Sequence, residues 1–252
     1  MLYNAFDDKT EALITPESFY GKQKKICDIC IGTFSHHVVE WALQKLTCTQ
    51  AAQIAGVNGN RPVWLTEYRG KKLAFYMTGV GSAITGSDLE DVHWLTGAGK
   101  FILFGSCGSL DQSLTAGKLI VPTHAFRDEG FSWHYMPPSD YVVMKNAERV
   151  KTLLQELGVP CVEGRTWTTD AIYRETRGKM EKRKAEGCIA VEMECAGAQA
   201  VCDFRGFELY YFLFSSDLLD AEEWEARTLG GEEEHNHQFT SFHIALEMAL
   251  CL

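Results

Sequence analysis

Short apolar runs alternate with segments of helical periodicity along most of this chain. Apolar runs bounded by turn-forming residues predict strands at residues 25–31, 63–68, 72–77, 100–105, 118–126, 162–168, 188–193 and 208–215. Helical patterns that end at stops such as Gly158 and Gly206 predict helices at 36–46, 83–97, 146–157, 175–186, 194–204 and 238–251. Residues 1–23 are polar and irregular. This alternation predicts an α/β fold around a central mixed sheet.

Two carboxylates follow one of the apolar runs. The run 188–191 leads into Glu192-Met193-Glu194 and then into a helical pattern of small residues. A carboxylate removed from water is costly unless it is paired, so these acids need partners. The oxygens of an ionised carboxylate match the two hydroxyls of a ribose diol. Pairing with Lys or Arg, or capping of the following helix, would also satisfy them, and the sequence leaves these alternatives open.

Two glycine-rich segments follow other predicted strands. Residues 101–104 run into Gly105-Ser106-Cys107-Gly108-Ser109, and residues 73–77 run into Thr78-Gly79-Val80-Gly81-Ser82. Glycines beside a hydroxyl residue at a strand end let backbone N–H groups approach an anion or a sugar closely. The spacing of Gly79, Gly81 and Gly86 misses the dinucleotide pattern G-x-G-x-x-G. A Rossmann cofactor site is therefore disfavoured.

Charge and composition narrow the class of ligand. The chain has 252 residues, a formal net charge of −10 and a pI of about 5.3, which opposes binding to nucleic acids or acidic membranes. No apolar stretch is long enough for a membrane span, and the N-terminus shows no secretory pattern. Nine cysteines, an odd number, suit a reducing cytoplasm better than a disulfide framework. With no linker dividing residues 1–252, we expect a single cytoplasmic domain that binds small molecules.

Two clusters resemble metal sites, but each has a simpler interpretation. Cys27 and Cys30 form a C-x-x-C pair near His36 and His37, yet the alternation around them predicts a buried strand. Residues 232–237 (Glu-Glu-Glu-His-Asn-His) are expected to form a solvated acidic loop before the last helix. We therefore expect no metal ion.

Together these segments resemble the nucleoside phosphorylase family, which includes purine nucleoside and uridine phosphorylases and related nucleosidases. The resemblance covers nearly the whole chain and rests on residues 31–32, 79–81, 105–108, 127–135, 168–173, 191–194 and 216–217. It implies a three-layer α/β/α sandwich whose central mixed sheet is partly barrel-like. It also implies a pentosyltransferase that cleaves the N-glycosidic bond of a purine or pyrimidine nucleoside. Inorganic phosphate would be the co-substrate, with no other cofactor, giving a free base and ribose or deoxyribose 1-phosphate.

The resemblance also assigns roles to residues around the nucleoside. The sugar would be held by Glu194, with Glu192, Met193, Val80 and His134 around it. The base would stack on Tyr173 and Ile172, although Tyr173 could instead be a core residue. A flexible flap carrying Trp224 and Arg227 would close over the base, although these two residues could instead begin a solvated helix. Asp217 matches the acid that protonates or hydrogen-bonds purine N7, and Asp220 is near enough in sequence to be that acid instead.

The phosphate site is where the chain departs from the family pattern. Phosphate would contact Gly32, Gly105, Ser106, His36 and Arg61. The phosphorylases carry an arginine four residues after the first of these glycines and another just before the G-S-C-G turn; this chain has His36 and Phe104 there. Arginine forks normally hold phosphate. Hydrolysis by water, or nucleoside binding without turnover, are therefore the alternatives to phosphorolysis.

Two further properties follow from the resemblance alone. Asp217 favours purines, whereas residues 128–135 are closer to the uridine enzymes. The family implies a homo-oligomer, either a dimer or a trimer of dimers, with sites completed by a neighbouring subunit.

Overall fold

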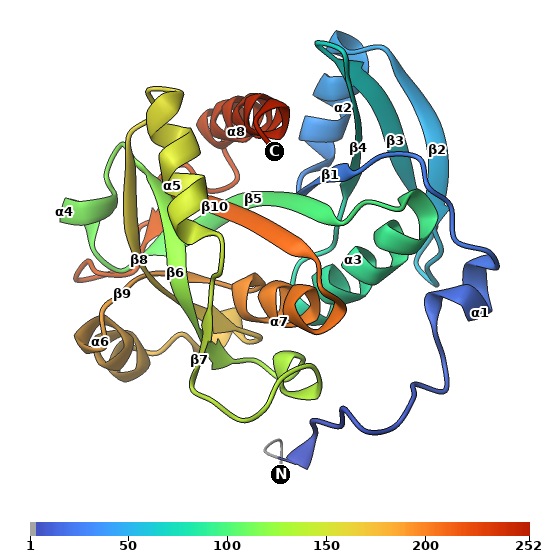
Figure 1. The fold of residues 1–252 in the computed structure, drawn as a ribbon. Coiled ribbons are helices and arrows are strands. Elements are labelled where there is room, and N and C mark those ends of the chain that lie inside the picture. The colour runs from blue at the N-terminus through green and yellow to red at the C-terminus, as the bar shows by residue number, and fades with distance from the viewer. Residues whose placement is uncertain (1–3) are drawn as a thin grey trace.

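One mixed sheet with helices on both faces forms the framework of the protein. The computed structural model describes residues 4–252 (Figure 1). The strands are β1 (Ile29–Thr33), β2 (Cys48–Ile54), β3 (Arg61–Tyr68), β4 (Lys71–Met77), β5 (Lys100–Ser109), β6 (Leu119–Asp128), β7 (Tyr141–Val143), β8 (Cys161–Thr169), β9 (Cys188–Glu192) and β10 (Glu208–Leu218). Their order is β10-β6-β8-β9-β5-β1-β4-β3-β2, and β7 pairs with β6.

Part of this sheet closes into a barrel. The long strands β5 and β10 pair in parallel, which joins the two ends of the run β10-β6-β8-β9-β5 into a ring of five strands. β5 continues on its other side to β1, β4, β3 and β2, which form an open extension. The prediction of a mixed, partly barrel-like sheet is confirmed.

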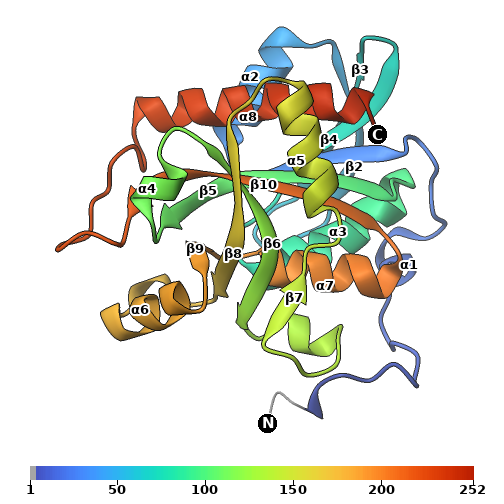
Figure 2. The same ribbon diagram turned by 60° about the vertical axis from the view of Figure 1, so that its left-hand side comes forward.

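The helices form the two outer layers. They are α1 (Pro16–Tyr20), α2 (His36–Lys45), α3 (Ser82–Thr96), α4 (Gln112–Thr115), α5 (Ala147–Glu156), α6 (Arg177–Ala185), α7 (Cys195–Arg205) and α8 (Glu232–Leu250), with two 3-10 turns, η2 (Ser132–His134) and η3 (Ile172–Arg174). In Figure 2, α2, α5 and α8 cover one face of the sheet, and α3 and α7 cover the other. Gly206 ends α7 in a left-handed conformation. The predicted three-layer arrangement is confirmed.

Small residues let the barrel strands approach one another. The segment Gly105–Ser109 was expected to be a turn, but it continues β5 and pairs with both β10 and β9. A Cβ on Gly108 would lie 2.9 Å from Val191 Cγ1 and would also meet the Leu219 side chain. Glycine is therefore required here for the three strands to meet, and the close approach brings their ends to one place.

The structure also corrects several boundaries. Strand β2 is a largely exposed edge strand, and β7, α1 and α4 are short, so none of them has the long apolar run that predicts an element. Residues 232–237 form the first turns of α8 instead of a loop, because acidic side chains stabilise a helix N-terminus. Within residues 4–252, none of the helices has the length and apolar character needed to cross a bilayer.

Candidate active site

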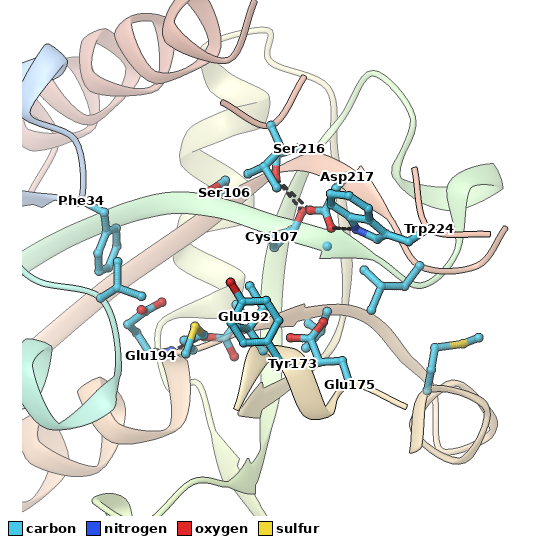
Figure 3. Close-up of a pocket in the computed structure, with 18 of the residues that line it drawn as sticks. Phe34, Ser106, Cys107, Tyr173, Glu175, Glu192, Glu194, Ser216, Asp217 and Trp224 are labelled. Atoms are coloured by element: carbon cyan, nitrogen blue, oxygen red, sulfur yellow. Dashed lines mark hydrogen bonds between the residues drawn. The ribbon is translucent and has the colours of Figure 1, made fainter. Parts of the chain in front are cut away.

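A cavity of about 620 Å³ lies where β5, β9 and β10 end. The carboxyl ends of these strands form its floor, η3 and the start of α6 form one wall, and the segment 219–229 forms another. Ligands of open α/β sheets gather at such strand ends. Figure 3 shows Phe34 and Glu194 at one end of the cavity and Asp217 and Trp224 at the other, with Tyr173 and Glu175 on the wall facing Asp217.

The Glu194 side chain connects the glycine-rich loop 78–82 to this cavity. It is 6% exposed, and its Oε1 accepts a hydrogen bond of 2.6 Å from the Gly81 amide. Gly81 has φ +101°, which favours glycine. Burial, together with the nearby Glu192 charge, raises the pKa of Glu194 to about 8, although the Gly81 hydrogen bond acts in the opposite direction. Val80, between the two glycines, and Met193 both line the cavity beside this carboxyl.

Glu192 has the capping role that was left open from the sequence. Its Oε2 accepts hydrogen bonds from the amides of Glu194 (2.7 Å) and Cys195 (2.6 Å), at the start of α7, and Oε1 accepts one from the Thr168 hydroxyl. Burial raises the pKa of Glu192, and these hydrogen bonds oppose the shift. Glu192 therefore positions Glu194 by fixing the helix start, while also forming part of the cavity wall.

A β-bulge positions Asp217. Strand β10 pairs with β5 through Ser215 opposite Cys107 and Asp217 opposite Gly108, so Ser216 is an extra residue. The Asp217 carboxylate accepts hydrogen bonds from Ser216 Oγ (3.0 Å) and from Trp224 Nε1 (2.8 Å). The indole of the 219–229 segment thus lies directly beside the acid (Figure 3).

The turn η3 places an aromatic ring and a fourth carboxyl at the cavity. Tyr173 is 97% exposed and Ile172 is 52% exposed, so the interpretation of Tyr173 as a core residue is excluded. Glu175 follows the turn and lines the same cavity. Burial and the Asp217 charge raise the pKa of Glu175 to about 7. The cavity therefore combines an exposed aromatic face with several carboxyl groups.

Comparison with known sequences identifies the family. The sequence model of the Phosphorylase superfamily matches residues 28–246. The chain belongs to this superfamily.

Individual relatives within and around the superfamily are distant. A DeoD-type purine nucleoside phosphorylase of Bacillus thuringiensis is 23% identical over 217 residues, which cover 85% of this chain and 86% of that protein. An uncharacterized protein of Acanthamoeba polyphaga mimivirus is 29% identical over 133 residues, and this match spans about half (51%) of either chain.

Solved structures share the fold of this superfamily member. A futalosine hydrolase mutant of Helicobacter pylori gives a TM-score of 0.73 at 17% identity, covering 90% of this chain and 100% of that one. The 5'-methylthioadenosine/S-adenosyl homocysteine nucleosidase of Campylobacter jejuni gives 0.72 at 18%, covering 90% and 100%. Toxoplasma gondii purine nucleoside phosphorylase gives 0.72 at 21%, covering 89% and 90%. The chain thus has a fold common to nucleoside phosphorylases and nucleosidases.

Most residues expected from the family resemblance to hold sugar and base line the cavity, but three do not. His134 is exposed and lies outside the cavity of its own chain. Asp220 forms an ion pair with Lys184 in a separate surface depression, so of the two candidate acids only Asp217 lines this cavity. Arg227 pairs with Glu225 at 3.3 Å and does not reach the lining.

Of the residues expected to bind phosphate, only Ser106 lines the cavity. Arg61 forms an ion pair with the buried Asp88, and the His36 ring contacts the His37 ring at a tilt, with centroids 3.9 Å apart. Gly32 and Gly105 lie within the sheet, where they make room for neighbouring side chains. Within one chain, these four residues therefore do not contribute to the cavity, because they take part in an ion pair, a ring contact or strand packing elsewhere.

Several lining residues were not expected from the sequence, among them Phe34, Glu175 and Arg177. Phe34 follows β1, and Glu175 and Arg177 follow Tyr173 by two and four positions. The pattern T-D-A-I-Y-R-E-T-R could have indicated Glu175 and Arg177, since charged side chains that follow the predicted base-stacking tyrosine lie close to the base. Among the described residues, no group of three or more His, Cys, Asp or Glu side chains is arranged to hold a metal ion.

Proposed function

We propose that the protein cleaves the N-glycosidic bond of a purine nucleoside and transfers the ribosyl group to phosphate. The observation that carries this proposal is the placement of Glu194, Ser106, Tyr173 and Asp217 around a single cavity. Cleavage builds positive charge on the ribose and negative charge on the departing base. The two ends of the cavity offer groups suited to each half of the substrate.

The sugar is proposed to lie at the Glu194 end. The buried carboxyl has oxygens for the 2′ and 3′ hydroxyls, and Val80 and Met193 supply apolar surface beside the ring. Because Glu194 also holds the Gly81 amide, the sugar-binding carboxyl and the loop beneath the sugar are fixed together.

The base is proposed to lie between Tyr173 and Asp217. The exposed Tyr173 ring offers a stacking face, and Asp217 reaches the base as hydrogen-bond partner or proton donor at N7. Trp224 Nε1 donates a hydrogen bond to the Asp217 carboxylate. Through this bond, the 219–229 segment both covers the site and orients Asp217.

Phosphate as the acceptor is supported by the DeoD-type relatives, which match over 85% of the chain. Ser106, at the end of β5, supplies a hydroxyl for it. A specific observation favours water as a second candidate acceptor. Arg177 is the only cation among the described residues that line the cavity, and it donates a 2.8 Å hydrogen bond to the Glu222 carbonyl.

An assay of base release separates the two acceptors. Purified protein is incubated with adenosine, inosine and uridine, with and without inorganic phosphate, and the free base and ribose 1-phosphate are quantified. The proposal expects purine release that depends on phosphate and yields ribose 1-phosphate. Release without phosphate, yielding free ribose, would establish the nucleosidase, and binding without release would establish a nucleoside-binding protein.

We further propose a homo-oligomer. Tyr173 and Val80 line the cavity but are largely exposed, and a neighbouring subunit would cover them. Light scattering at several protein concentrations tests this, and a monomer at all concentrations would contradict it.

A further inference from the structure

The Glu175 carboxyl is half-buried in the cavity and has no partner within residues 4–252. It follows η3, and its backbone amide bonds back to the Ile172 carbonyl at 3.2 Å. Among the described residues, its side chain makes no hydrogen bond and no ion pair. A carboxyl withdrawn from water without a partner is costly. An unpaired carboxyl that lines a ligand cavity is suited to form a hydrogen bond with the bound ligand.

Glu175 and Asp217 face the same space from different walls (Figure 3). Asp217 is held by Ser216 and Trp224, so its position is fixed. Among the described residues, the other ionisable groups that line the cavity are Glu192 and Glu194 near the proposed sugar site, Cys107, Tyr173, and Arg177, which donates a hydrogen bond to the Glu222 carbonyl. The base end therefore presents two carboxyls to a heterocycle.

We propose that Glu175 contacts the nucleobase beside Asp217, and that the two carboxyls together select 6-aminopurine nucleosides over 6-oxopurine nucleosides. This inference rests on the proposed function. A 6-aminopurine presents one hydrogen-bond donor, the amino group, next to one acceptor, N7. One ionised and one neutral carboxyl match that pair. A 6-oxopurine presents two acceptors, O6 and N7, and requires both carboxyls to be neutral.

The partial protonation of Glu175 suits the 6-aminopurine, which needs one ionised and one neutral carboxyl. Its pKa is raised to about 7 by burial and by the charge of Asp217, so near pH 7 it is divided between the neutral and ionised forms. Acidification makes the neutral form dominant.

The test compares kcat/KM for adenosine and inosine in wild type, Glu175→Gln and the control Glu181→Gln. Glu181 lies exposed on α6, outside the cavity, and loses the same charge. We expect wild type to prefer adenosine by about tenfold or more at pH 7.5, since unpaired polar groups in a binding site discriminate strongly. The amide of Glu175→Gln always carries a donor, so the preference should fall at least about fivefold, and the control should match wild type.

Two results would overturn the inference while leaving N-glycosidic cleavage in place. One is a wild type that prefers inosine, and the other is a preference that Glu175→Gln does not change. If no nucleoside is cleaved, the proposed function fails instead. In that case, calorimetric titration with free adenine and hypoxanthine still decides the matter. Equal affinity for the two bases, or a difference unaffected by Glu175→Gln, would contradict the role of Glu175.

Discussion

The Glu194 carboxylate accepts a 2.6 Å hydrogen bond from the amide of Gly81, a residue 113 positions earlier in the chain. Through this bond, the end of β9 and the loop after β4 form one surface beneath the proposed sugar site. The second bond between these segments, from Ser82 Oγ to the Met193 carbonyl at 3.0 Å, keeps the two in register. The sugar site is thus fixed by contacts that exist without substrate.

Replacing Glu194 should damage catalysis more than folding. Glu194→Gln retains an oxygen for the Gly81 amide but loses the carboxyl that is proposed to bind the diol. At pH 8.5, above the Glu194 pKa of about 8, we expect kcat/KM to fall about 10-fold to 10²-fold, the usual range for losing a hydrogen bond to a charged group. Steady-state kinetics measures the effect, and Glu67→Gln, which removes an exposed carboxyl from β3, is the control. Equal activity of Glu194→Gln and wild type would show that the sugar does not bind to this carboxyl.

The same residue should make stability depend on pH. The pKa of Glu194 is about 8 in the folded chain, above its ordinary value of 4.5. Between these values the native state keeps a proton that the unfolded state has lost, so the free energy of unfolding falls as pH rises. Glu194→Gln removes this contribution. Its melting temperature relative to wild type should therefore be higher at pH 8.5 than at pH 5, which thermal unfolding at the two values checks. A difference independent of pH would refute the assignment.

Loss of the Tyr173 ring should weaken substrate binding without unfolding the protein. The side chain is 97% exposed, so Tyr173→Ala removes almost no core packing. Stacking on a base contributes about 1–3 kcal/mol, which predicts a rise in KM of about 5-fold to 150-fold. Tyr173→Phe keeps the ring and serves as the matched variant. The prediction fails if both variants behave alike, or if the melting temperature of Tyr173→Ala drops substantially.

Asp217 and Trp224 should act as a pair. Asp217→Asn removes the acid at the base and should lower kcat by about 10²-fold to 10⁴-fold. Trp224→Phe keeps an aromatic ring but removes the Nε1–H bond to the carboxylate, and should lower kcat by about tenfold. In the double variant, the loss should equal that of Asp217→Asn alone, because the tryptophan acts through the acid. Additive losses in this double-mutant cycle would show independent roles.

Gly108 should be required for folding. A Cβ at this position would press on Val191 and Leu219, where β5, β9 and β10 meet. Gly108→Ala should lower the free energy of unfolding by about 1–3 kcal/mol, as is usual for overpacking. Denaturant unfolding measures this. Gly178→Ala is the control, since a Cβ there meets nothing within 4 Å, and a loss as large as that of Gly108→Ala would contradict the packing explanation.

The sequence indicated the layers of the fold because apolar runs of strand length record burial directly. It did not indicate β2 (Cys48–Ile54), which has no continuous run of large apolar residues, since an edge strand has few buried positions. It also placed a turn at Gly105–Ser109, because glycines and a serine favour turns locally, whereas in the protein they continue β5 through a crowded crossing. Barrel closure depends on pairing between strands about 100 residues apart, which no local pattern contains.

At the candidate site, the sequence could identify groups but not their partners. Glu194 and Asp217 stood out as acids at strand ends, and both line the cavity. Arg61 was a reasonable phosphate ligand until the structure showed its ion pair with Asp88. Glu175 was overlooked because an acid at a helix start has an ordinary interpretation, and only the cavity shows that its carboxyl lacks a partner. Which charges neutralise one another is decided by tertiary contacts.

A crystal structure with a non-hydrolysable purine nucleoside analogue, whose sugar and base are joined by carbon, tests the central claim most directly. We predict that both ribose hydroxyls lie within hydrogen-bond distance of the Glu194 carboxyl and that the base lies between Tyr173 and Asp217. A nucleoside bound elsewhere, or a sugar placed away from Glu194, would contradict the account.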